Sequence, residues 1–402
     1  MKIVQINTTC GIGSTGKISV DISRLLTGKG IENYVIYSSR SDGYGMGISC
    51  CGDGYQKLQA LKSRIRGNYG FNSVRATKKI IAALDKIGPD IVHLHNIHGH
   101  DCNLELLFTY FREKKTKLVW TFHDCWAFTG YCPHFTMVRC DKWQTRCAGC
   151  PQKQEYSWFV DRSGSLFDKK KALLQGLDLT IVTPSRWLAE LVERSFLKEH
   201  LVKIIHNGID LAVFKPTVGK FREKYAIEPD KKIVLGVAFG WDAGKGLDVF
   251  VRLADTLPES YQIVLVGTTE KVEAQLPQNV ISIRHTQDQQ ELAEIYTEAD
   301  VFVNPTREEN YPTVNMEAVA CGTPVLTFRT GGSPEMLDET CGSVVACDDI
   351  AAMEREITRI CDCQPFSKEQ CLEKAKGFDK TERFKEYLEL YERINASGAE
   401  GN

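Results

Sequence analysis

The sequence lacks the features that would place it across a membrane or on nucleic acid. No apolar run reaches the roughly 18 residues that a transmembrane helix requires. Its 50 basic and 52 acidic residues leave a net charge of −2, so no excess of positive charge attracts nucleic acid. The first residues, Met-Lys-Ile-Val-Gln-Ile-Asn, predict a strand rather than a signal peptide. With 43% hydrophobic and 25% charged residues, the protein is expected to be soluble and cytoplasmic.

The length and the residue pattern predict two α/β domains. A chain of 402 residues suggests two cores of about 200 residues each. Short apolar stretches alternate with helical patterns, which predicts parallel sheets with helices on both faces. The expected strands are residues 2–7, 33–39, 89–95, 117–123, 179–184 and 202–206 in the first half, and residues 232–238, 262–267, 280–283, 301–304, 324–328 and 342–345 in the second.

The two halves are expected to separate near residues 211–221, where the strand pattern restarts. We predict a doubly wound N-terminal domain over residues 1–212 and a second doubly wound domain over residues 213–380. Residues 381–402 are expected to form an amphipathic helix with a frayed tail. Doubly wound sheets bind ligands at the carboxyl ends of their strands, so functional residues are expected there.

Two carboxylates, Glu309 and Glu317, stand eight residues apart around a predicted helix start. Pro312 suits the first turn of a helix, so residues 313–321 are expected to be helical. The unpaired N–H groups of a first turn bind anions. A carboxylate beside such a site suits a nucleotide, since it accepts hydrogen bonds from ribose while the N–H groups hold the diphosphate.

This segment resembles a known family. Glu309 and Glu317, with Tyr-Pro between them and Ala-Val-Ala-Cys-Gly-Thr-Pro-Val after them, resemble the donor-site signature of family 4 retaining glycosyltransferases. These enzymes have the GT-B fold, two Rossmann-like domains that face a central cleft. The resemblance also implies that the C-terminal helix after residue 381 crosses back to the N-terminal domain. Further matches are Ser185-Arg-Trp-Leu188, Asn207-Gly-Ile-Asp210, Phe214-Lys-Pro216 and Gly244-Lys-Gly246. Residues 123–130 resemble the capsule and exopolysaccharide branch, of the colanic-acid type.

The resemblance implies a role for each matching residue on the donor side. Glu309 would contact the donor sugar and steady the developing oxocarbenium charge, and Glu317 would hold the ribose. Lys245 and the N–H groups of Thr313 and Val314 would stabilise the leaving diphosphate.

One position departs from the family pattern. Phe239 stands where the family often has an Arg, six residues before Lys245. Arg307 and Arg329 are the nearby candidates for the missing charge. A solvated surface role is the alternative for Lys245.

The Gly-rich turn Gly11-Ile-Gly-Ser-Thr-Gly-Lys17 matches two nucleotide-binding patterns. It fits the dinucleotide fingerprint, and Arg40 after the second strand leaves an NADP-dependent oxidoreductase open. It also fits a P-loop, except that Ile18 replaces the Ser or Thr that binds magnesium. In the favoured interpretation the glycines let backbone N–H groups approach the donor phosphate or the acceptor, with Gly13 at the donor and Gly11 and Gly16 on the acceptor side. A tight turn without a ligand is the alternative.

Several histidines follow the predicted strands of the first half. The resemblance places His123 beside the donor sugar and His95 on the acceptor side. A structural histidine at a strand end is the alternative for His123. A metal site is a further alternative for a cluster of nearby residues, although packing or sugar contacts are favoured. The cluster contains His93, His95, His98, His100 and Asp101. The family resemblance implies no divalent ion in catalysis.

Four of the fifteen cysteines form a C-x7-C-x6-C-x2-C pattern within an insertion over residues 125–151. They are Cys132, Cys140, Cys147 and Cys150. The C-x2-C end suits tetrahedral zinc, which predicts a structural zinc site. Free thiols and a disulfide stay open as alternatives.

The segment between Gly54 and Leu84 contains seven cations and no acid. Leu58, Leu61 and Ile65 recur in it at helical spacing. A basic amphipathic helix lies on anionic membranes, which predicts peripheral attachment to the inner membrane face. A solvated helix face is the alternative.

Together these features predict a retaining hexosyltransferase. It would move a sugar from UDP- or GDP-sugar to a saccharide, or a polyprenyl-diphosphate-linked saccharide, in cell-surface polysaccharide synthesis. The alternatives are another GT-B nucleotide-sugar enzyme of the epimerase type, the oxidoreductase, and an inactive nucleotide-sugar-binding subunit.

Overall fold

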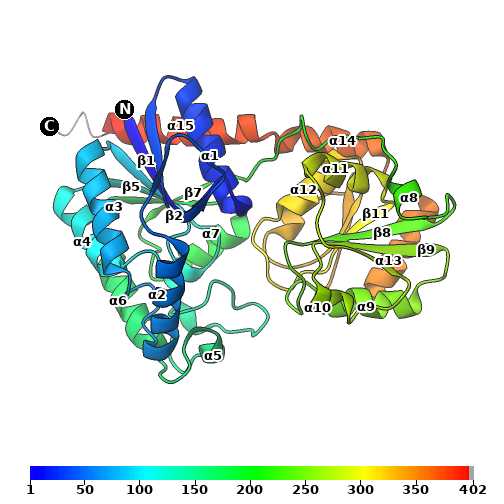
Figure 1. Ribbon diagram of the computed structural model, residues 1–402, viewed down its shortest axis with the longest axis horizontal. Helices are drawn as coiled ribbons and strands as arrows, with labels where there is room; N and C mark the ends of the chain where they lie inside the picture. The colour runs from blue at the N-terminus through cyan, green and yellow to red at the C-terminus, as the bar shows by residue number, and fades with distance from the viewer. Residues whose placement is uncertain (398–402) are drawn as a thin grey trace. The chain divides into compact units, whose positions relative to one another are not determined.

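A computed structural model describes residues 1–397, which form two compact units (Figure 1). Unit 1 contains Met1–His206 and the chain from Arg383 onward, and unit 2 contains Asn207–Glu382. Each unit is built on a single sheet in which all neighbouring strands are parallel. The prediction of two parallel α/β domains is therefore confirmed.

The seven-stranded sheet of unit 1 has the order β3-β2-β1-β4-β5-β6-β7. The strand order reverses direction between β1 and β4, so the carboxyl ends of these two strands flank the site where doubly wound sheets bind ligands. The strands are β1 (Lys2–Cys10), β2 (Glu32–Ser41), β3 (Gly47–Ser49), β4 (Ile91–Leu94), β5 (Lys117–Thr121), β6 (Leu179–Thr183) and β7 (Leu201–Ile204).

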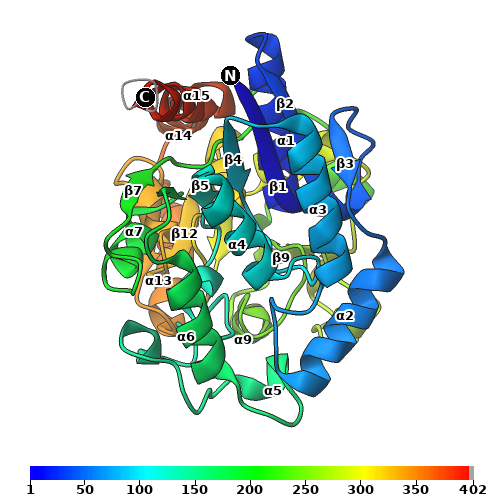
Figure 2. The same cartoon turned by 90° about the vertical axis from the view of Figure 1, so that its left-hand side faces the viewer.

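Helices cover both faces of this sheet because successive strand residues point to opposite sides. One face packs Val4, Val92 and Leu118 against α3, α4 and α6, which Figure 2 shows nearest the viewer. The other face packs Ile3 and Ile91 against α1 and α15. The helices are α1 (Gly13–Gly28), α2 (Asp53–Arg66), α3 (Val74–Ile87), α4 (Leu104–Lys114), α5 (Lys153–Tyr156), α6 (Ser163–Leu174), α7 (Arg186–Glu193) and α15 (Lys380–Ser397), with 3-10 turns η1 (Trp126–Phe128) and η2 (Lys142–Gln144).

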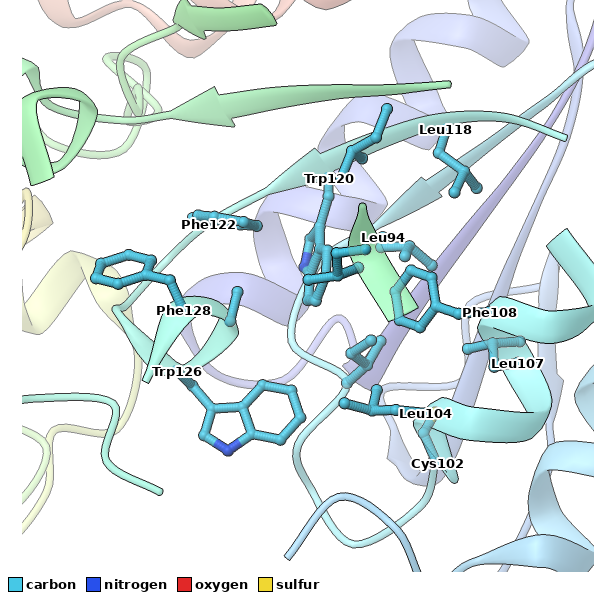
Figure 3. Packing of buried hydrophobic residues seen from close by; sticks show 14 of the residues in the cluster. Leu94, Cys102, Leu104, Leu107, Phe108, Leu118, Trp120, Phe122, Trp126 and Phe128 are labelled. Carbon is cyan, nitrogen blue, oxygen red and sulfur yellow. The ribbon is translucent and has the colours of Figure 1, made fainter. Parts of the chain in front are cut away.

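The core under α4 continues without a break to the carboxyl end of β5 (Figure 3). Phe108 of α4 lies 5.6 Å from Trp120 of β5, and Trp120 lies 5.0 Å from Phe122, measured between ring centroids. Trp126 and Phe128 of η1 extend this cluster. Such aromatic packing holds the backbone that carries residues 123–128 in one position.

The six-stranded sheet of unit 2 has the order β10-β9-β8-β11-β12-β13, and its strand order reverses between β8 and β11. One face packs against α11 and α12 and the other against α9 and α13. The strands are β8 (Lys232–Val237), β9 (Tyr261–Val266), β10 (Val280–Ile283), β11 (Val301–Asn304), β12 (Val325–Phe328) and β13 (Gly342–Val345). The helices are α8 (Phe221–Lys224), α9 (Leu247–Thr256), α10 (Glu270–Glu273), α11 (Gln289–Glu298), α12 (Thr313–Ala320), α13 (Ile350–Cys363) and α14 (Lys368–Ala375), with η3 (Ser333–Met336) and η4 (Lys376–Phe378).

Two of the differences from the sequence-based boundaries concern the first helix and the division between the units. The Gly-rich turn was expected to precede the first helix, but helix α1 begins inside it at Gly13, and Gly16 packs against Thr9 of β1. The units divide at His206, whereas the expected boundary followed residue 212. Ile209 belongs to unit 2, since its N–H donates to Phe378 O at 2.8 Å and its side chain lies in that core.

The C-terminal helix α15 runs from Lys380 to Ser397. Its residues from Arg383 onward are part of unit 1, where Tyr387 and Tyr391 are buried beside the sheet. The hydroxyl of Tyr391 lies 2.6 Å from Nδ1 of His93. The tail expected to fray falls partly on residues 398–402, which lie outside the described residues.

Candidate functional site

In unit 2, the loops after β8 and β11 bring Lys245 and Glu309 together. Lys245 Nζ lies 2.8 Å from Glu309 Oε2, with 39% and 21% of the two side chains exposed. The strand order reverses between these two strands, so the pair stands at the ligand-binding position of the sheet. The two residues are 64 positions apart in sequence, and the parallel sheet joins them.

Arg307 fixes the two loops to each other. Its guanidinium forms a bidentate pair with Asp248 at 2.7 and 2.8 Å and a third bond to Asp348 at 2.6 Å. The hydrogen bonds that it donates to these carboxylates, that to Asp248 first, raise the pKa of Arg307 above its usual value. Arg307 N also donates to Gly244 O at 2.8 Å. Two carboxylates therefore balance the charge of Arg307.

Phe239 and Arg329, the other two positions that bear on the missing positive charge, lie on the surface of unit 2. The side chain of Phe239 is 99% exposed on the loop after β8. Arg329 follows β12 and is exposed, and its backbone N–H donates to Val345 O at 2.8 Å. Its loop approaches Glu309 closely: a Cβ added to Gly331 would lie 1.8 Å from Glu309 O. Of the two arginines considered, Arg329 is the one that stays accessible.

Helix α12 starts as expected and presents Thr313 and Val314 in its first turn. Its end also matches the prediction, with Cys321 as C-cap and Gly322 at a φ of +86° after it. Glu317 lies on the second turn, and its Oε2 accepts a hydrogen bond from the buried Tyr296 hydroxyl at 3.1 Å. This bond orients the Glu317 carboxylate.

A buried polar network that the sequence did not suggest holds α12 to the sheet. Asn304 Nδ2 donates to Asn315 Oδ1 at 2.8 Å, and Asn315 Nδ2 donates to Ser333 Oγ at 2.9 Å. The Thr327 hydroxyl lies 2.9 Å from the Ser333 hydroxyl. Buried polar groups that are fully paired define one geometry, so this network sets the position of the α12 N-terminus.

In unit 1, the Gly-rich turn follows β1 at the reversal of strand order. Gly11 and Gly13 have φ values of +73° and +69°, a region that favours glycine. A Cβ on Gly11 would overlap the Asp42 side chain at 2.1 Å, and one on Gly16 would press on Thr9 Oγ1 at 2.7 Å. Beside Gly13 no atom lies within 4 Å of that position. Gly11 and Gly16 thus serve close packing, while Gly13 leaves an open approach to the backbone.

His95 and His123 are stacked at the ends of β4 and β5, with ring centroids 5.5 Å apart. Hydrogen bonds define their tautomers. Gln5 Nε2 donates to Ser19 O, so Gln5 Oε1 accepts from His95 Nε2 at 2.9 Å. His95 Nδ1 then accepts from His123 Nε2 at 3.2 Å. The remaining ring nitrogen of His123, Nδ1, is therefore an acceptor.

Burial favours the neutral form of both of these histidines. Burial lowers the pKa of His95 well below its usual value and lowers that of His123 to about 4. His95 is 1% exposed and lies beneath His123. Its geometry makes it a positioning residue for His123.

A mostly buried ion pair beside His95 and His123 was not foreseen from the sequence. His98 Nε2 lies 2.8 Å from Asp124 Oδ2. Burial raises the pKa of Asp124, but the His98 charge and hydrogen bond lower it more, to about 2. For His98, burial lowers the pKa and Asp124 raises it more, so the net shift is upward. No spacing rule pairs a loop histidine with a carboxylate 26 positions away.

Lys170 was also missed, because it stands in a run of three lysines that reads as a surface segment. It is 1% exposed, and its Nζ donates to Trp126 O at 2.7 Å and to Thr129 O at 3.1 Å. The Nζ also lies 3.6 Å from the Trp126 ring centroid. Burial lowers the pKa of Lys170 to about 7. Lys170 therefore fixes η1, next to His123.

Two family models match most of the chain. Residues 16–213 match the model described as Glycosyltransferase Family 4, and residues 231–363 match the model described as Glycosyl transferases group 1. The chain belongs to these glycosyltransferases. We therefore set aside the oxidoreductase alternative for the Gly-rich turn.

Individual relatives agree with the family. The glycosyltransferase is 26% identical over 380 residues to the putative colanic acid biosynthesis glycosyl transferase WcaC of Escherichia coli (strain K12), which covers 87% of this chain and 88% of that protein. Sucrose-phosphate synthase from Thermosynechococcus elongatus has a TM-score of 0.71 at 19% identity, covering 98% of this chain and 99% of that one. Anabaena HepE in complex with UDP and glucose has a TM-score of 0.71 at 14% identity, covering 98% and 100%. The fold is GT-B, as predicted.

The cysteine pattern of the glycosyltransferase gathers in one region of unit 1. Burial raises the pKa of the Cys132 thiol to about 12, with further contributions from Cys150, Cys147 and Cys140. All fifteen cysteines are free thiols. Within residues 1–397, no three His, Cys, Asp or Glu side chains are grouped to hold a metal ion. Zinc binding by these cysteines stays a prediction.

The histidines considered as an alternative metal site point to different partners. His93 contacts Tyr391 and Thr121, and His100 Nδ1 lies 3.3 Å from Ser63 Oγ. These contacts fit packing rather than metal binding. In the part of the chain that the structure describes, no helix is both long and apolar enough to cross a membrane.

Proposed function

We propose that this glycosyltransferase is a retaining enzyme that moves a hexose from a UDP- or GDP-sugar to a growing, polyprenyl-diphosphate-linked saccharide. The observation that carries the proposal is the Lys245–Glu309 ion pair at the strand reversal of unit 2, one loop before the N-terminus of α12. A cation, a carboxylate and a helix N-terminus together match the charges of a nucleotide-diphosphate sugar.

In the proposed reaction, the bond between the sugar C1 and the diphosphate oxygen breaks first. The diphosphate leaves with the electron pair, and Lys245 with the N–H groups of Thr313 and Val314 balances its charge. Glu309 steadies the positive charge that develops on the sugar ring. The acceptor hydroxyl then attacks C1 on the face that the diphosphate left, and its proton passes to the departing phosphate oxygen.

The negative charge of the donor can separate Lys245 from Glu309, which form an ion pair. The diphosphate competes with Glu309 for Lys245, and Glu309 is then available to the sugar. Phe239 contributes no charge to the diphosphate, so we assign the second cation to Arg329. Glu317, oriented by Tyr296, accepts hydrogen bonds from the ribose hydroxyls.

In unit 1, His123 orients the donor sugar by accepting a hydrogen bond from a sugar hydroxyl at Nδ1. His95 acts through His123, and the open backbone at Gly13 admits the phosphate or the acceptor. Two relatives support the substrate class, since one is named for colanic acid biosynthesis and the structure of another contains UDP and glucose. We extend these names to a cell-surface polysaccharide as the product.

Attachment to an anionic membrane through residues 54–84 would bring the enzyme to a lipid-linked acceptor. The seven cations and the absence of acids in this segment support the attachment. We also propose that Cys132, Cys140, Cys147 and Cys150 bind a structural zinc ion. Sugar transfer itself requires no metal in this proposal. Metal analysis of protein purified without chelator should give close to one zinc per chain, and a folded, metal-free preparation would remove this part of the proposal.

The donor site is tested by transfer assays on purified protein, after nucleotide-sugars are screened for thermal stabilisation. Glu309→Gln should lower kcat by about 10²-fold or more, whereas Glu317→Ala should raise the KM for the donor more than it lowers kcat. Glu259→Gln, an exposed glutamate before β9, is the matched control. Wild-type rates in both site variants would refute the donor-site assignment. Binding of a nucleotide-sugar without hydrolysis or transfer would instead identify an inactive binding subunit.

A further inference from the structure

The burial pattern of helix α2 is the reverse of that of an ordinary surface helix. It buries the polar side chains of Gln59 and Ser63 and exposes Leu58, Leu61 and Ile65 for 49%, 45% and 44% of their surface. These three apolar residues follow one another at spacings of three and four, so they form one stripe along the helix. A helix in water normally has the opposite arrangement, which indicates that this stripe meets an apolar phase.

Cations border the apolar stripe on both sides. A rotation of about 100° per residue places Lys62 and Arg66 along one edge of the stripe and Lys57 and Arg64 along the other. Asp53 in the first turn is the one acid of α2, and residues 54–84 contain none. An apolar stripe between two rows of cations matches the layered chemistry of an anionic lipid surface.

A second segment, distant in sequence, adds three apolar side chains beside α2. Trp158, Phe159 and Val160, which follow α5, are exposed for 43%, 71% and 42% of their surface. Figures 1 and 2 both show α5 next to α2 within unit 1. Trp158 N donates to Arg64 O at 2.8 Å, and the Arg64 guanidinium lies 6.0 Å from the Trp158 ring centroid.

Buried contacts hold the two segments in a fixed relation. The hydroxyl of Tyr131 donates to Gly67 O at 2.8 Å, just after α2, and accepts from Arg162 N at 2.9 Å, just after the loop. Gly67 leaves no room for a side chain, because a Cβ there would lie 2.8 Å from Val160 O. The nearest acid of the loop, Asp161, is engaged by the N–H groups of Cys150 and Ser163. These contacts therefore hold the exposed aromatic residues of the loop in a defined position beside α2.

We propose that Leu58, Leu61 and Ile65 of α2 together with the Trp158–Phe159–Val160 loop form one docking face for an anionic lipid bilayer. The cations of residues 54–84 draw the face to the headgroups, and the aromatic loop enters the interface, where Trp and Phe are favoured. The inference deepens the proposed membrane attachment and rests on it. It adds the loop, for which the sequence predicted no role.

Vesicle sedimentation with the full chain tests the docking face. Wild-type protein should bind vesicles containing phosphatidylglycerol but not vesicles of phosphatidylcholine alone, and binding should decline as salt is raised. The double variant Trp158→Ser/Phe159→Ser should lower the partition coefficient by at least about tenfold. Val218→Ser, which removes a 96% exposed apolar side chain from unit 2, is the matched control and should bind like wild type.

Quenching by brominated lipid provides a readout that does not depend on a disruptive substitution. The other five tryptophans, Trp120, Trp126, Trp143, Trp187 and Trp241, are buried or half-buried. Bromine in the lipid chains should therefore quench a fraction of the wild-type fluorescence that disappears in Trp158→Phe. Equal quenching of the wild type and this variant would overturn the inference.

The outcomes separate this inference from the function that it deepens. If wild type binds anionic vesicles and the loop double variant binds equally, attachment by residues 54–84 stands and the loop is not part of the face. If wild type does not bind them, the attachment and the inference both fail, while transfer to a soluble saccharide acceptor still tests the chemistry. Concentration-dependent dimers that the double variant abolishes would show that the face pairs two copies, which also overturns the inference.

Discussion

The two units each contain an ion pair with a separation of 2.8 Å, Lys245–Glu309 in unit 2 and His98–Asp124 in unit 1. Their surroundings differ. The side chains of the first pair are 39% and 21% exposed, and those of the second are 20% and 11% exposed. Water screens the first pair, and pairs of that kind contribute about 0–1 kcal/mol to stability. Losing one partner of a buried pair costs about 3–5 kcal/mol, because a charge is left without compensation.

The two ion pairs therefore have the same separation but different roles. The exposed pair is held weakly enough to exchange partners when a charged ligand arrives, which suits the proposed donor site. The buried pair fixes the backbone beside His123, where the neutral histidines need fixed tautomers. Unit 2 therefore offers charges that water can reach, and unit 1 offers a less exposed pair beside His123.

The largest expected effect concerns the buried pair. His98→Leu should lower the free energy of unfolding by about 3–5 kcal/mol, because Asp124 would be left charged and buried. Urea denaturation measures the change, and His285→Leu, an exposed histidine in unit 2, should stay within about 0.5 kcal/mol of wild type. The double variant His98→Leu/Asp124→Asn should recover part of the loss. A loss below about 1 kcal/mol in the single variant would contradict the comparison.

The exposed pair should show the opposite response. Lys245→Met should change the free energy of unfolding by no more than about 1 kcal/mol, yet lower kcat/KM for sugar transfer by about 10²–10³-fold. Lys271→Met, an exposed lysine on α10, is the control and should retain full activity. A stability loss in Lys245→Met as large as that of His98→Leu would show that the two pairs are alike.

The pH dependence of stability should sharpen the comparison. Asp124 has a pKa of about 2, below its ordinary value of 3.8, so its stabilising contribution is present above the ordinary value and is lost as pH falls through 2. The pKa of His98 is raised, so its contribution is present below about 6.5 and is lost as pH rises through the raised value. The stability difference between wild type and His98→Leu should peak between these limits and fall by about 2–3 kcal/mol toward pH 2. A difference that does not vary with pH would contradict the ionic character of the pair.

The smallest effect concerns the tautomers of His95 and His123. Gln5→Leu removes the acceptor of the His95 Nε2 proton, and one lost neutral hydrogen bond of about 1 kcal/mol should lower kcat roughly five- to tenfold. Nitrogen NMR of the histidine rings should show His95 and His123 changing tautomer, which a merely structural role of Gln5 would not produce. Gln5→Asn is the conservative comparison. An unchanged NMR pattern with reduced activity would remove the tautomer explanation.

Much of the fold follows from local pattern. The parallel strands of both units were expected from short apolar stretches, and residues 280–283, 301–304 and 342–345 match the strands at both ends. The donor-side residues Glu309 and Glu317 were placed around a helix start that the structure contains. Such features depend on neighbours in sequence, because caps, helix starts and strand periodicity are set within a few residues.

The unit boundary and the residues that hold the site in place could not be predicted from the local sequence pattern. Ile209 joins unit 2 through a bond to Phe378, and Asn315 is held by Asn304 and Ser333. His98 and Lys170 carry no local signal of burial. These side chains are positioned by partners far away in sequence, and only close packing decides which polar groups lose water and must be paired.

The sequence by itself determined two parallel α/β domains, the glycosyltransferase signature and a basic segment without acids. Tertiary structure alone decided that Lys245 meets Glu309, that Arg307 is neutralised while Arg329 stays accessible, and that Trp158–Phe159–Val160 joins α2 in one face. The physical reason is the range of the forces involved. Secondary structure responds to the nearest residues, whereas charge pairing, tautomers and exposed surface depend on which distant segments the parallel sheets bring together.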